Sequence, residues 1–257
     1  MAHKYIFSTL IFIILFIACE DIPRDNVLDP GNPDSYQTPV ILLEAFVNTA
    51  NPYNYNDLAL QALDSIKETY KQQVLIAEYH RDASGYHDSL SHPVFDALYE
   101  KYVNAVNPGS KGVPDIFVNG TTGRVQGPSS INSVFNRLNI IIADLVVLRS
   151  YFTLEPVEVK MNGSEITASC KIARLGRESS EELLLKMISL RRIDTRELER
   201  VVITVEKSVS FPGLEAGEIV TKKFNPVTLP KKPDYVLFIL SSADELTVYQ
   251  TIKVIVQ

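Results

Sequence analysis

The spacing of hydrophobic and polar positions changes once, after the third predicted helix. Before that point, two short and nearly unbroken apolar runs at residues 40–47 and 73–79 predict strands buried on both faces. Apolar side chains that recur every three or four residues predict helices over residues 55–70, from Pro93 onward, and over residues 131–148. Because a helix separates the two strands, they are expected to pair in parallel.

Beyond the third helix, apolar and polar residues alternate with a period of two. Residues 157–161 and 166–172 alternate on either side of Asn162-Gly163, a pair typical of tight hairpin turns. Further strands are predicted at residues 182–190, 199–209, 218–229, 235–241 and 246–256. Such a series of short strands indicates an antiparallel β-sandwich of the immunoglobulin or fibronectin type.

The first eighteen residues predict a signal peptide. Residues 5–18 are almost entirely apolar, but the run is shorter than the ~20 residues that span a bilayer. It ends in Leu-Phe-Ile-Ala-Cys, which resembles the bacterial lipobox, so Cys19 is expected to be lipidated after cleavage. An ordinary signal peptide followed by an incidental cysteine is the alternative. Residues 19–39 are rich in Pro, Asp and Asn and predict a flexible tether.

Cysteine content and charge restrict the chemistry. The chain of 257 residues has two cysteines, Cys19 and Cys170, so acylation of Cys19 would leave no intramolecular disulfide. Cys170 lies in an alternating apolar segment and is expected to be buried. The net charge of -6 and the small size of the basic clusters argue against a nucleic-acid partner.

Residues 40–150 carry a resemblance to thioredoxin-like proteins. The segment from Ala45 to Tyr53 resembles the family's Phe-x-x-x-x-Cys-x-Pro-Cys active-site strand and loop, with Pro52 kept. Val113-Pro114 resembles the family's segment with a cis proline, and Asn119-Gly120 and the last helix resemble its final hairpin and helix. The whole layout is similar to bacterial outer-membrane lipoproteins with a thioredoxin-like domain followed by a β-sandwich.

The fold expected from the sequence is an α/β thioredoxin-like domain followed by an all-β immunoglobulin/fibronectin-like sandwich. The expected boundaries are a lipoprotein signal peptide at residues 1–18, the tether at 19–39, the thioredoxin-like domain at 40–150 and the sandwich at 151–257.

Redox catalysis is excluded by the residues in the active-site loop. Thiol-disulfide exchange needs a thiolate, but Ala50 and Tyr53 stand where the family has its cysteines. The loop Ala50, Asn51, Pro52 and Tyr53 is therefore expected to be vestigial, and no enzyme activity is expected. In thioredoxin-like proteins the backbone beside the cis proline pairs with an extended peptide, so Val113 and Pro114 are expected to form a peptide-binding groove. The alternative is that the loop residues only cap the helix and hold the turn.

A polar connection after the second strand gathers three of the four histidines. Its candidate ligands are His80, Asp82, His87 and His92, with Asp88 beside them. Zinc would accept such ligands, but the spacing matches no metal motif, and polar loops often collect these residues without function. No cofactor is expected.

The sequence thus favours a lipid-anchored protein of the bacterial cell envelope, in the outer membrane with a periplasmic or surface face. Its expected role is binding or scaffolding, with the membrane as one partner through the lipid and a peptide or protein as the other. A metal-dependent enzyme or metal-binding protein that uses the connection from His80 to His92 is the alternative. A further possibility is a rigid spacer that presents the sandwich loops.

Overall fold

The computed structural model describes residues 25–83, 85–127, 130–192, 201–229 and 231–256. Its helices are α2 (Tyr55–Tyr70), α3 (Pro93–Val106) and α4 (Ile131–Val146), with a 3-10 turn at Lys71–Gln73. Its strands are β1 (Ile41–Val47), β2 (Val74–His80), β3 (Asp115–Val118), β4 (Gly123–Gln126), β5 (Phe152–Asn162), β6 (Glu165–Arg174), β7 (Leu183–Arg191), β8 (Val201–Phe211), β9 (Ile219–Lys223), β10 (Val227–Thr228), β11 (Tyr235–Ser242) and β12 (Val248–Ile255). The three predicted helices and the parallel pairing of β1 with β2 are confirmed.

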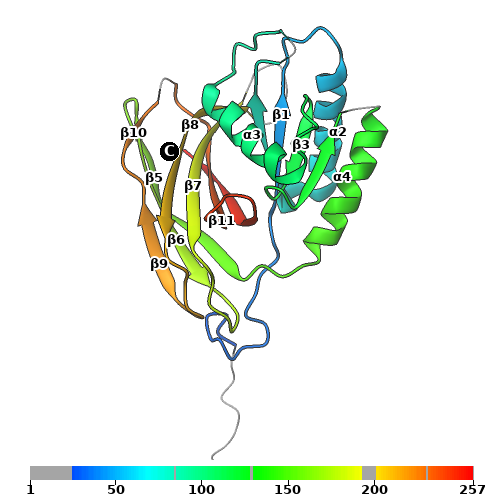
Figure 1. Cartoon of the computed structure of the whole chain (residues 1–257). Helices are drawn as coiled ribbons and strands as arrows, with labels where there is room; N and C mark the ends of the chain where they lie inside the picture. Colours follow the sequence, from blue (N-terminus) through cyan, green and yellow to red (C-terminus); the bar gives the residue numbers. More distant parts are fainter. Residues whose placement is uncertain (1–24, 84, 128–129, 193–200, 230, 257) are drawn as a thin grey trace, which may run out of the picture.

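Strands from both halves of the chain form one eight-stranded sheet, in the order β12-β11-β7-β8-β2-β1-β3-β4 (Figure 1). The halves join where β2 pairs with β8 in parallel, with Glu78 opposite Val201. The expected α/β thioredoxin-like domain followed by an all-β immunoglobulin/fibronectin-like sandwich is therefore wrong. More of the described residues lie in strands than in helices, and they form no clear thioredoxin-like α/β domain.

Both faces of β1 are buried, as its apolar run predicts. Ile41, Leu43 and Ala45 face a hydrophobic cluster with α2 and α4. Leu42 and Phe46 face the opposite way, into a second cluster that contains α3. The helices thus cover both faces of this part of the sheet.

The physical reason for the joined halves lies in β7 and β11. Leu185 and Met187 of β7 point into the core of the second half, whereas Ile188 and Leu190 point into the cluster with α3 and β1. β11 divides its side chains in the same way. Strands that are apolar on both faces need a partner layer on each side, and the first half supplies the second layer.

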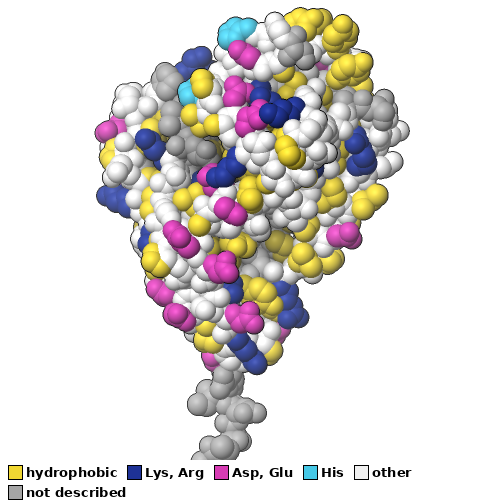
Figure 2. Space-filling view, in the orientation of Figure 1, with side chains coloured by type: hydrophobic (Ala, Val, Ile, Leu, Met, Phe, Trp, Pro, Cys, Tyr) yellow, Lys and Arg dark blue, Asp and Glu magenta, His cyan; other side chains and the backbone are white. Residues whose placement is uncertain are grey.

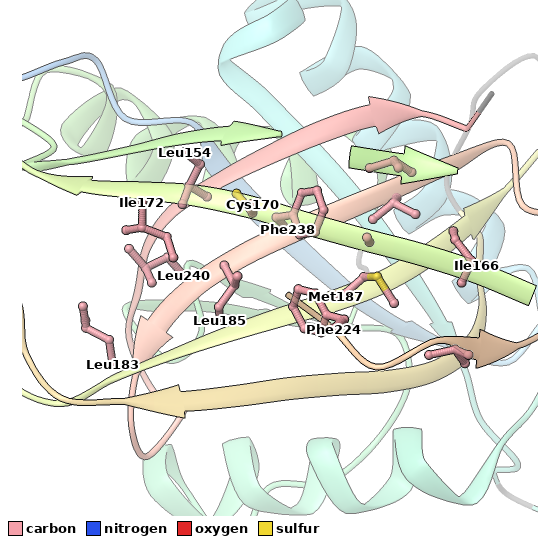
Figure 3. Close-up of a cluster of buried hydrophobic side chains, with 14 of the residues drawn as sticks. Leu154, Ile166, Cys170, Ile172, Leu183, Leu185, Met187, Phe224, Phe238 and Leu240 are labelled. Atoms are coloured by element: carbon pink, nitrogen blue, oxygen red, sulfur yellow. The ribbon is translucent and has the colours of Figure 1, made fainter. Parts of the chain in front are cut away.

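A smaller sheet packs on the other face of these strands. It has the order β10-β6-β5, and β9 also pairs with β6. Cys170 of β6 lies in the core between the two sheets, in the same cluster as Phe238 and Met187 (Figure 3). Cys170 is free and fully buried, as predicted, and burial raises its pKa to about 12.

The β3–β4 turn docks against the hairpin between β11 and β12. Gly120 pairs with Thr247, and the amide of Thr121 donates to the carbonyl of Leu246 at 2.7 Å. Lys101 of α3 contacts the carboxylate of Glu245 in the same hairpin at 2.6 Å. These contacts fix the two halves together at a second place.

A substitution at Gly120 is expected to break this docking. Gly120 has φ +72, and an added Cβ would lie 2.4 Å from the Leu246 carbonyl oxygen. Gly120→Ala should therefore lower the free energy of unfolding by about 2 to 4 kcal/mol, from backbone strain plus the clash. Gly163 is the matched control, because it has φ +61 but nothing within 4 Å of its Cβ position. Gly163→Ala should cost only about 1 kcal/mol in the same urea titration; equal losses at both sites would contradict the docking argument.

The described part of the predicted tether (residues 19–39) is packed on the body, so the prediction of flexibility is wrong there. The Ser35 hydroxyl is buried and accepts a hydrogen bond from the amide of Gly176 at 2.8 Å. Gln37 pairs with Ser150 through two backbone hydrogen bonds. The Asp and Asn residues that suggested a tether instead close short turns.

Cys19 and the signal peptide lie outside the described residues. Among the helices that the structure describes, none is both long and apolar enough to cross a bilayer.

Candidate functional site at the carboxyl ends of β1 and β2

The candidate site lies at the carboxyl ends of two parallel strands, β1 and β2. Val47 at the end of β1 lies opposite His80 at the end of β2. The loop from Asn48 to Asn54 leads from β1 into α2, and the connection from Arg81 to His92 leads from β2 into α3. We call the first of these the β1–α2 loop. Polar groups gather at such strand ends in sheets with parallel strands.

Asn48 holds the two segments together. Its buried side-chain amide donates to the carbonyls of Arg81 and Tyr86 at 2.8 and 2.9 Å, and its oxygen accepts from the amide of Asn51 at 2.9 Å. The backbone amide of Asn48 donates to the side chain of Asn56 at 3.1 Å. The residue type of Asn56 would suit a cap for α2, but its side chain bonds to Asn48 instead. The N-cap residue is Asn54, whose side chain makes no capping hydrogen bond.

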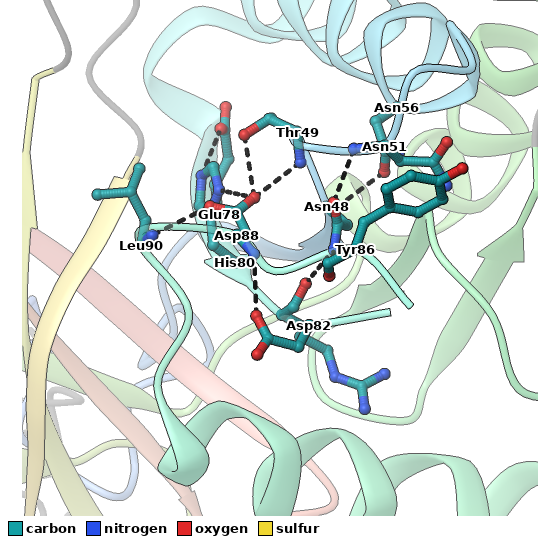
Figure 4. Close-up of polar contacts among 11 residues, drawn as sticks. Asn48, Thr49, Asn51, Asn56, Glu78, His80, Asp82, Tyr86, Asp88 and Leu90 are labelled. Atoms are coloured by element: carbon teal, nitrogen blue, oxygen red, sulfur yellow. Dashed lines mark hydrogen bonds and ion pairs between the residues drawn. The ribbon is translucent and has the colours of Figure 1, made fainter. Parts of the chain in front are cut away.

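Asp88 is the second anchor (Figure 4). One of its oxygens accepts from the amide and the hydroxyl of Thr49, at 2.7 and 3.0 Å, and also contacts Nδ1 of His80 at 3.0 Å. The other oxygen accepts from the amide of Leu90 at 3.0 Å. Asp88 and His80 are both 2% exposed. The carboxylate therefore fixes the start of the β1–α2 loop on a buried histidine.

The pair is ionised at neutral pH. Burial lowers the pKa of His80, but hydrogen bonds and charges from Asp88 and Glu78 outweigh it and raise that pKa to about 9. Burial likewise raises the pKa of Asp88, but the His80 hydrogen bond, two backbone amides and the imidazolium charge hold it well below its usual range. Nε2 of His80 lies 3.8 Å from Glu78. A buried imidazolium between two carboxylates is suited to holding structure rather than to meeting a substrate.

The β1–α2 loop exposes an aromatic pair. Tyr53 and Tyr55 are 60% and 50% exposed, and their rings stack with centroids 5.9 Å apart. Ala50 and Pro52 are exposed beside them. In Figure 2 hydrophobic side chains gather at the upper right of the molecule, over the connection from β1 to α2. The loop thus carries a small apolar surface on a fixed backbone.

The Val113–Pro114 bond is cis and lies next to this loop. β3 pairs with β1 so that Asp115 lies opposite Phe46, which places Val113 across from Asn48 when the register is continued. Val113 is half-buried, and its backbone groups form no hydrogen bond within the part of the chain that the structure describes. The loop residues and the Val113–Pro114 segment, both chosen from the sequence, are thus neighbours.

The histidines chosen as metal candidates do not converge. His80 is buried with Asp88, whereas His87 is exposed and pairs with Asp82 at 2.9 Å. Nδ1 of His92 accepts from the amide of Val94 and caps α3. No group of three or more potential metal ligands occurs among the residues described. Among the described residues of this connection, three local roles thus separate the histidines chosen as metal ligands.

Two buried polar clusters were missed by the sequence analysis. Asp115 is fully buried and binds Arg124 through two guanidinium nitrogens, at 2.6 to 3.2 Å, and the Tyr99 hydroxyl at 3.0 Å. Glu44 of β1 is also fully buried and accepts from the hydroxyls of Tyr79 and Tyr102, at 3.2 and 2.9 Å. Glu44 is the one carboxylate in a strand that the sequence predicts to be buried on both faces. That position alone indicated that it needs buried hydrogen-bond partners.

Removal of Asn48 tests its role as an anchor. Asn48→Ala leaves the carbonyls of Arg81 and Tyr86 and the amide of Asn51 without their side-chain partner. We expect a loss of about 2 to 3 kcal/mol in the free energy of unfolding, together with faster amide exchange at Asn51. Asn51→Ala is the control, because it removes one exposed hydrogen bond, to the Tyr53 amide, and should cost less than about 1 kcal/mol. Unchanged exchange at Asn51 in the Asn48 variant would contradict the anchoring role.

The fold and site together define a β-rich protein of two packed sheets with helices on both faces of the parallel strand pair, which presents a fixed, aromatic loop. No family model and no curated protein matches the chain. Among solved structures, HBP35 of Porphyromonas gingivalis is similar with a TM-score of 0.63 and 15% identity, over 85% of this chain and 76% of that one. A protein from Agrobacterium tumefaciens is similar with a TM-score of 0.52 and 14% identity, over 85% of this chain and 95% of that one. The chain thus shares its fold with bacterial proteins, along most of its length.

Proposed function

We propose that this chain is a lipid-anchored protein of the bacterial cell envelope that binds an extended peptide or a protein partner at the β1–α2 loop, without catalysing a reaction. The observation that carries the proposal is the exposed, stacked pair Tyr53 and Tyr55 on a loop fixed by Asn48 and Asp88.

Exposed tyrosines on a fixed backbone are suited to recognition. Tyrosine buries a large apolar area on binding and has few side-chain rotations to lose. The loop backbone is already held by side chains, from Asn48 to the amide of Asn51 and from Asn51 to the amide of Tyr53. A partner therefore meets a surface that needs little ordering, which lowers the entropic cost of association.

Val113 offers backbone groups beside the same surface. Its amide and carbonyl have no partner among the described residues, so an extended peptide could add to them as a strand adds to a sheet edge. The tyrosines would then contact side chains of that peptide, and the backbone of Val113 would fix its direction.

The chemistry of the loop favours binding over catalysis. The loop presents alanine, asparagine, proline and tyrosine side chains, and the ionised His80–Asp88 pair lies beneath it at 2% exposure. Asp88 already accepts hydrogen bonds from the amides of Thr49 and Leu90, and His80 already bonds to Asp88. The pair therefore holds the two segments in place. The lipobox-like sequence that ends at Cys19 supports the membrane anchor and the envelope location.

Photo-crosslinking in the native envelope tests the proposal. With p-benzoylphenylalanine in place of Tyr53, irradiation should give discrete crosslinked products from the membrane fraction, and Ala50→Arg in the same chain should abolish them. Ala50 is exposed, so the arginine can be accommodated without disturbing the core.

Glu68 provides the control position for this experiment. It is exposed near the far end of α2, the helix that begins at Tyr55. The same crosslinker at Glu68 should give none of the Tyr53 products. Identical products at both positions, or products from Tyr53 that persist with Ala50→Arg, would refute binding at the loop.

A further inference from the structure

A pocket of about 340 Å³ lies at the end of the molecule away from the β1–α2 loop. It opens between three segments: residues 32–35, the link before β5, and the turn after β6. The side chains that give it its chemistry are those of Arg149, Arg174 and Arg177. We call it the arginine pocket. In Figure 1 the described chain begins at this end, below the small sheet.

Arg174 is a buried cation whose hydrogen bonds go to backbone carbonyls. Its side chain lines the pocket although the residue is only 9% exposed. Its guanidinium donates to the carbonyls of Glu178 and Tyr151, at 2.8 and 3.1 Å, and lies over the Phe152 ring. It forms no ion pair with the carboxylates that the structure describes. A guanidinium has five N–H donors, so donors remain for a group inside the pocket.

The burial of Arg174 carries an electrostatic cost. Desolvation lowers its pKa from the ordinary arginine value, which means that its surroundings disfavour the charge. The charge of nearby Glu178 opposes this fall in pKa only in part. A buried guanidinium that hydrogen-bonds to neutral carbonyls is stabilised further when an anion binds beside it.

Two further arginines strengthen the positive potential. Arg149 is exposed, with its guanidinium 4.1 Å from the centre of the Tyr36 ring, and Arg177 is exposed at the rim. Glu178 is the single acidic residue among the residues that line the pocket, and it gives its backbone carbonyl to Arg174. The lining therefore combines three positive charges with one negative charge.

The pocket is formed before any ligand arrives. Gly176 has φ +76, and a Cβ there would lie 2.8 Å from the Tyr151 ring, so the turn that carries Arg174 and Arg177 packs tightly under that ring. The amide of Gly176 donates to the buried hydroxyl of Ser35. The segment before β1 thus fixes the arginine-bearing turn.

We propose that the arginine pocket binds a phosphate group, with Arg174 as the buried anchor and Arg149 and Arg177 as contacts at the rim. Several guanidinium forks match a phosphate, because it presents several oxygens and can carry more than one negative charge. The volume lies at the lower end of the range for small-molecule pockets, which suits a head group or a small phosphorylated compound.

Two sources could supply this phosphate. One is a soluble phosphate compound, and the other is the head group of an anionic lipid. The second source follows from the lipid anchor proposed at Cys19, because the pocket wall begins thirteen residues later, at Asn32. Both sources present the same chemistry to the arginines.

Titration of the full chain with inorganic phosphate, in neutral detergent and a phosphate-free buffer, measures the first source. We expect phosphate to raise the melting temperature and to bind with heat evolved. Arg149→Ser/Arg177→Ser removes two exposed side chains and should weaken binding by at least about tenfold without loss of fold. Lys231→Ser/Lys232→Ser removes the same charge from exposed positions outside the pocket lining and should leave binding unchanged.

Reconstitution of the chain in lipid vesicles tests whether the phosphate comes from a lipid head group. The wild type and both double variants are placed in vesicles of phosphatidylcholine alone or of phosphatidylcholine and phosphatidylglycerol in equal amounts. A higher melting temperature in the anionic vesicles that the arginine variant alone loses identifies a lipid phosphate as the ligand. A response to inorganic phosphate alone, lost in the same variant, identifies a soluble one. The proposal is overturned if neither probe binds, or if the arginine and lysine variants respond alike.

Discussion

Asp115→Ala is expected to lower the free energy of unfolding by about 3 to 5 kcal/mol, because it leaves a cation without its partner in the core. Asp115 is fully buried, and the side chain of Arg124, which binds it through two nitrogens, is 10% exposed. Burial raises the pKa of Asp115, while Arg124 and Tyr99 oppose the rise. Alanine removes the carboxylate but leaves the guanidinium over the Phe117 ring. Urea denaturation measures the loss.

A double variant separates the unpaired charge from the lost packing. Asp115→Ala/Arg124→Met removes both charges and fills part of the space, so it should recover about 1 to 3 kcal/mol of the single variant's loss. The interpretation of the cluster would be wrong if the double variant had a lower free energy of unfolding than Asp115→Ala. Additive losses of that kind would show that the two residues do not act as a pair.

The second large effect is a pH dependence that His80 controls. The pKa of His80 is raised from 6.5 to about 9 in the folded chain. A raised pKa means that the folded state holds this proton more tightly, so the stabilisation is fully present below pH 6.5 and is lost as pH rises through 9. Between these two pKa values we expect a total loss on the order of 3 kcal/mol, of which about 2 kcal/mol falls between pH 6.5 and about pH 8.5.

His80→Gln provides the comparison for this pH series. The variant keeps His87 and Cys170, so any slope from those groups is common to both proteins. Above about pH 8.5 the buried Cys170 adds its own loss, because its thiol ionises more readily once unfolded. The window from about pH 6.5 to about pH 8.5 therefore isolates His80. An equal slope in wild type and His80→Gln across this window would contradict an ionised His80–Asp88 pair.

Local pattern predicted the elements well. The helix α4 with its apolar stripe occurs as expected, because such a stripe depends on residues three and four positions apart. The expectation that Val113 lies near the β1–α2 loop came instead from the resemblance to thioredoxin-like proteins, and the register of β1 with β3 places the two side by side. These features depend on short sequence separations or on a simple pairing rule.

The joining of the two halves did not follow from local pattern. Glu78 pairs with Val201 across more than a hundred residues, and no periodicity records such a contact. A signal was nevertheless present in the unbroken apolar runs Leu183-Leu184-Leu185 and Val236–Leu240. A sandwich strand with one face in water should alternate, so these runs indicated a layer on each side.

The polar clusters were hidden for a different reason. The sequence places His80 and Asp88 in or beside a polar connection and does not single out Arg174, because sequence alone does not state which polar residues become enclosed. Their burial depends on the packing of segments such as the one around Ser35, which composition described as a tether.

The buried thiol of Cys170 can report the opening of both halves, because the two halves share an apolar layer. Cys170 sits in the second half, whereas Asp115 lies in the first, yet β7 and β11 contribute side chains to the cores of both. If the halves open as one cooperative unit, damage at Asp115 must accelerate the reaction of Cys170 with a thiol reagent by the same free energy that urea records. A reagent that changes colour when it reacts with the Cys170 thiol would thus report every such opening of the fold.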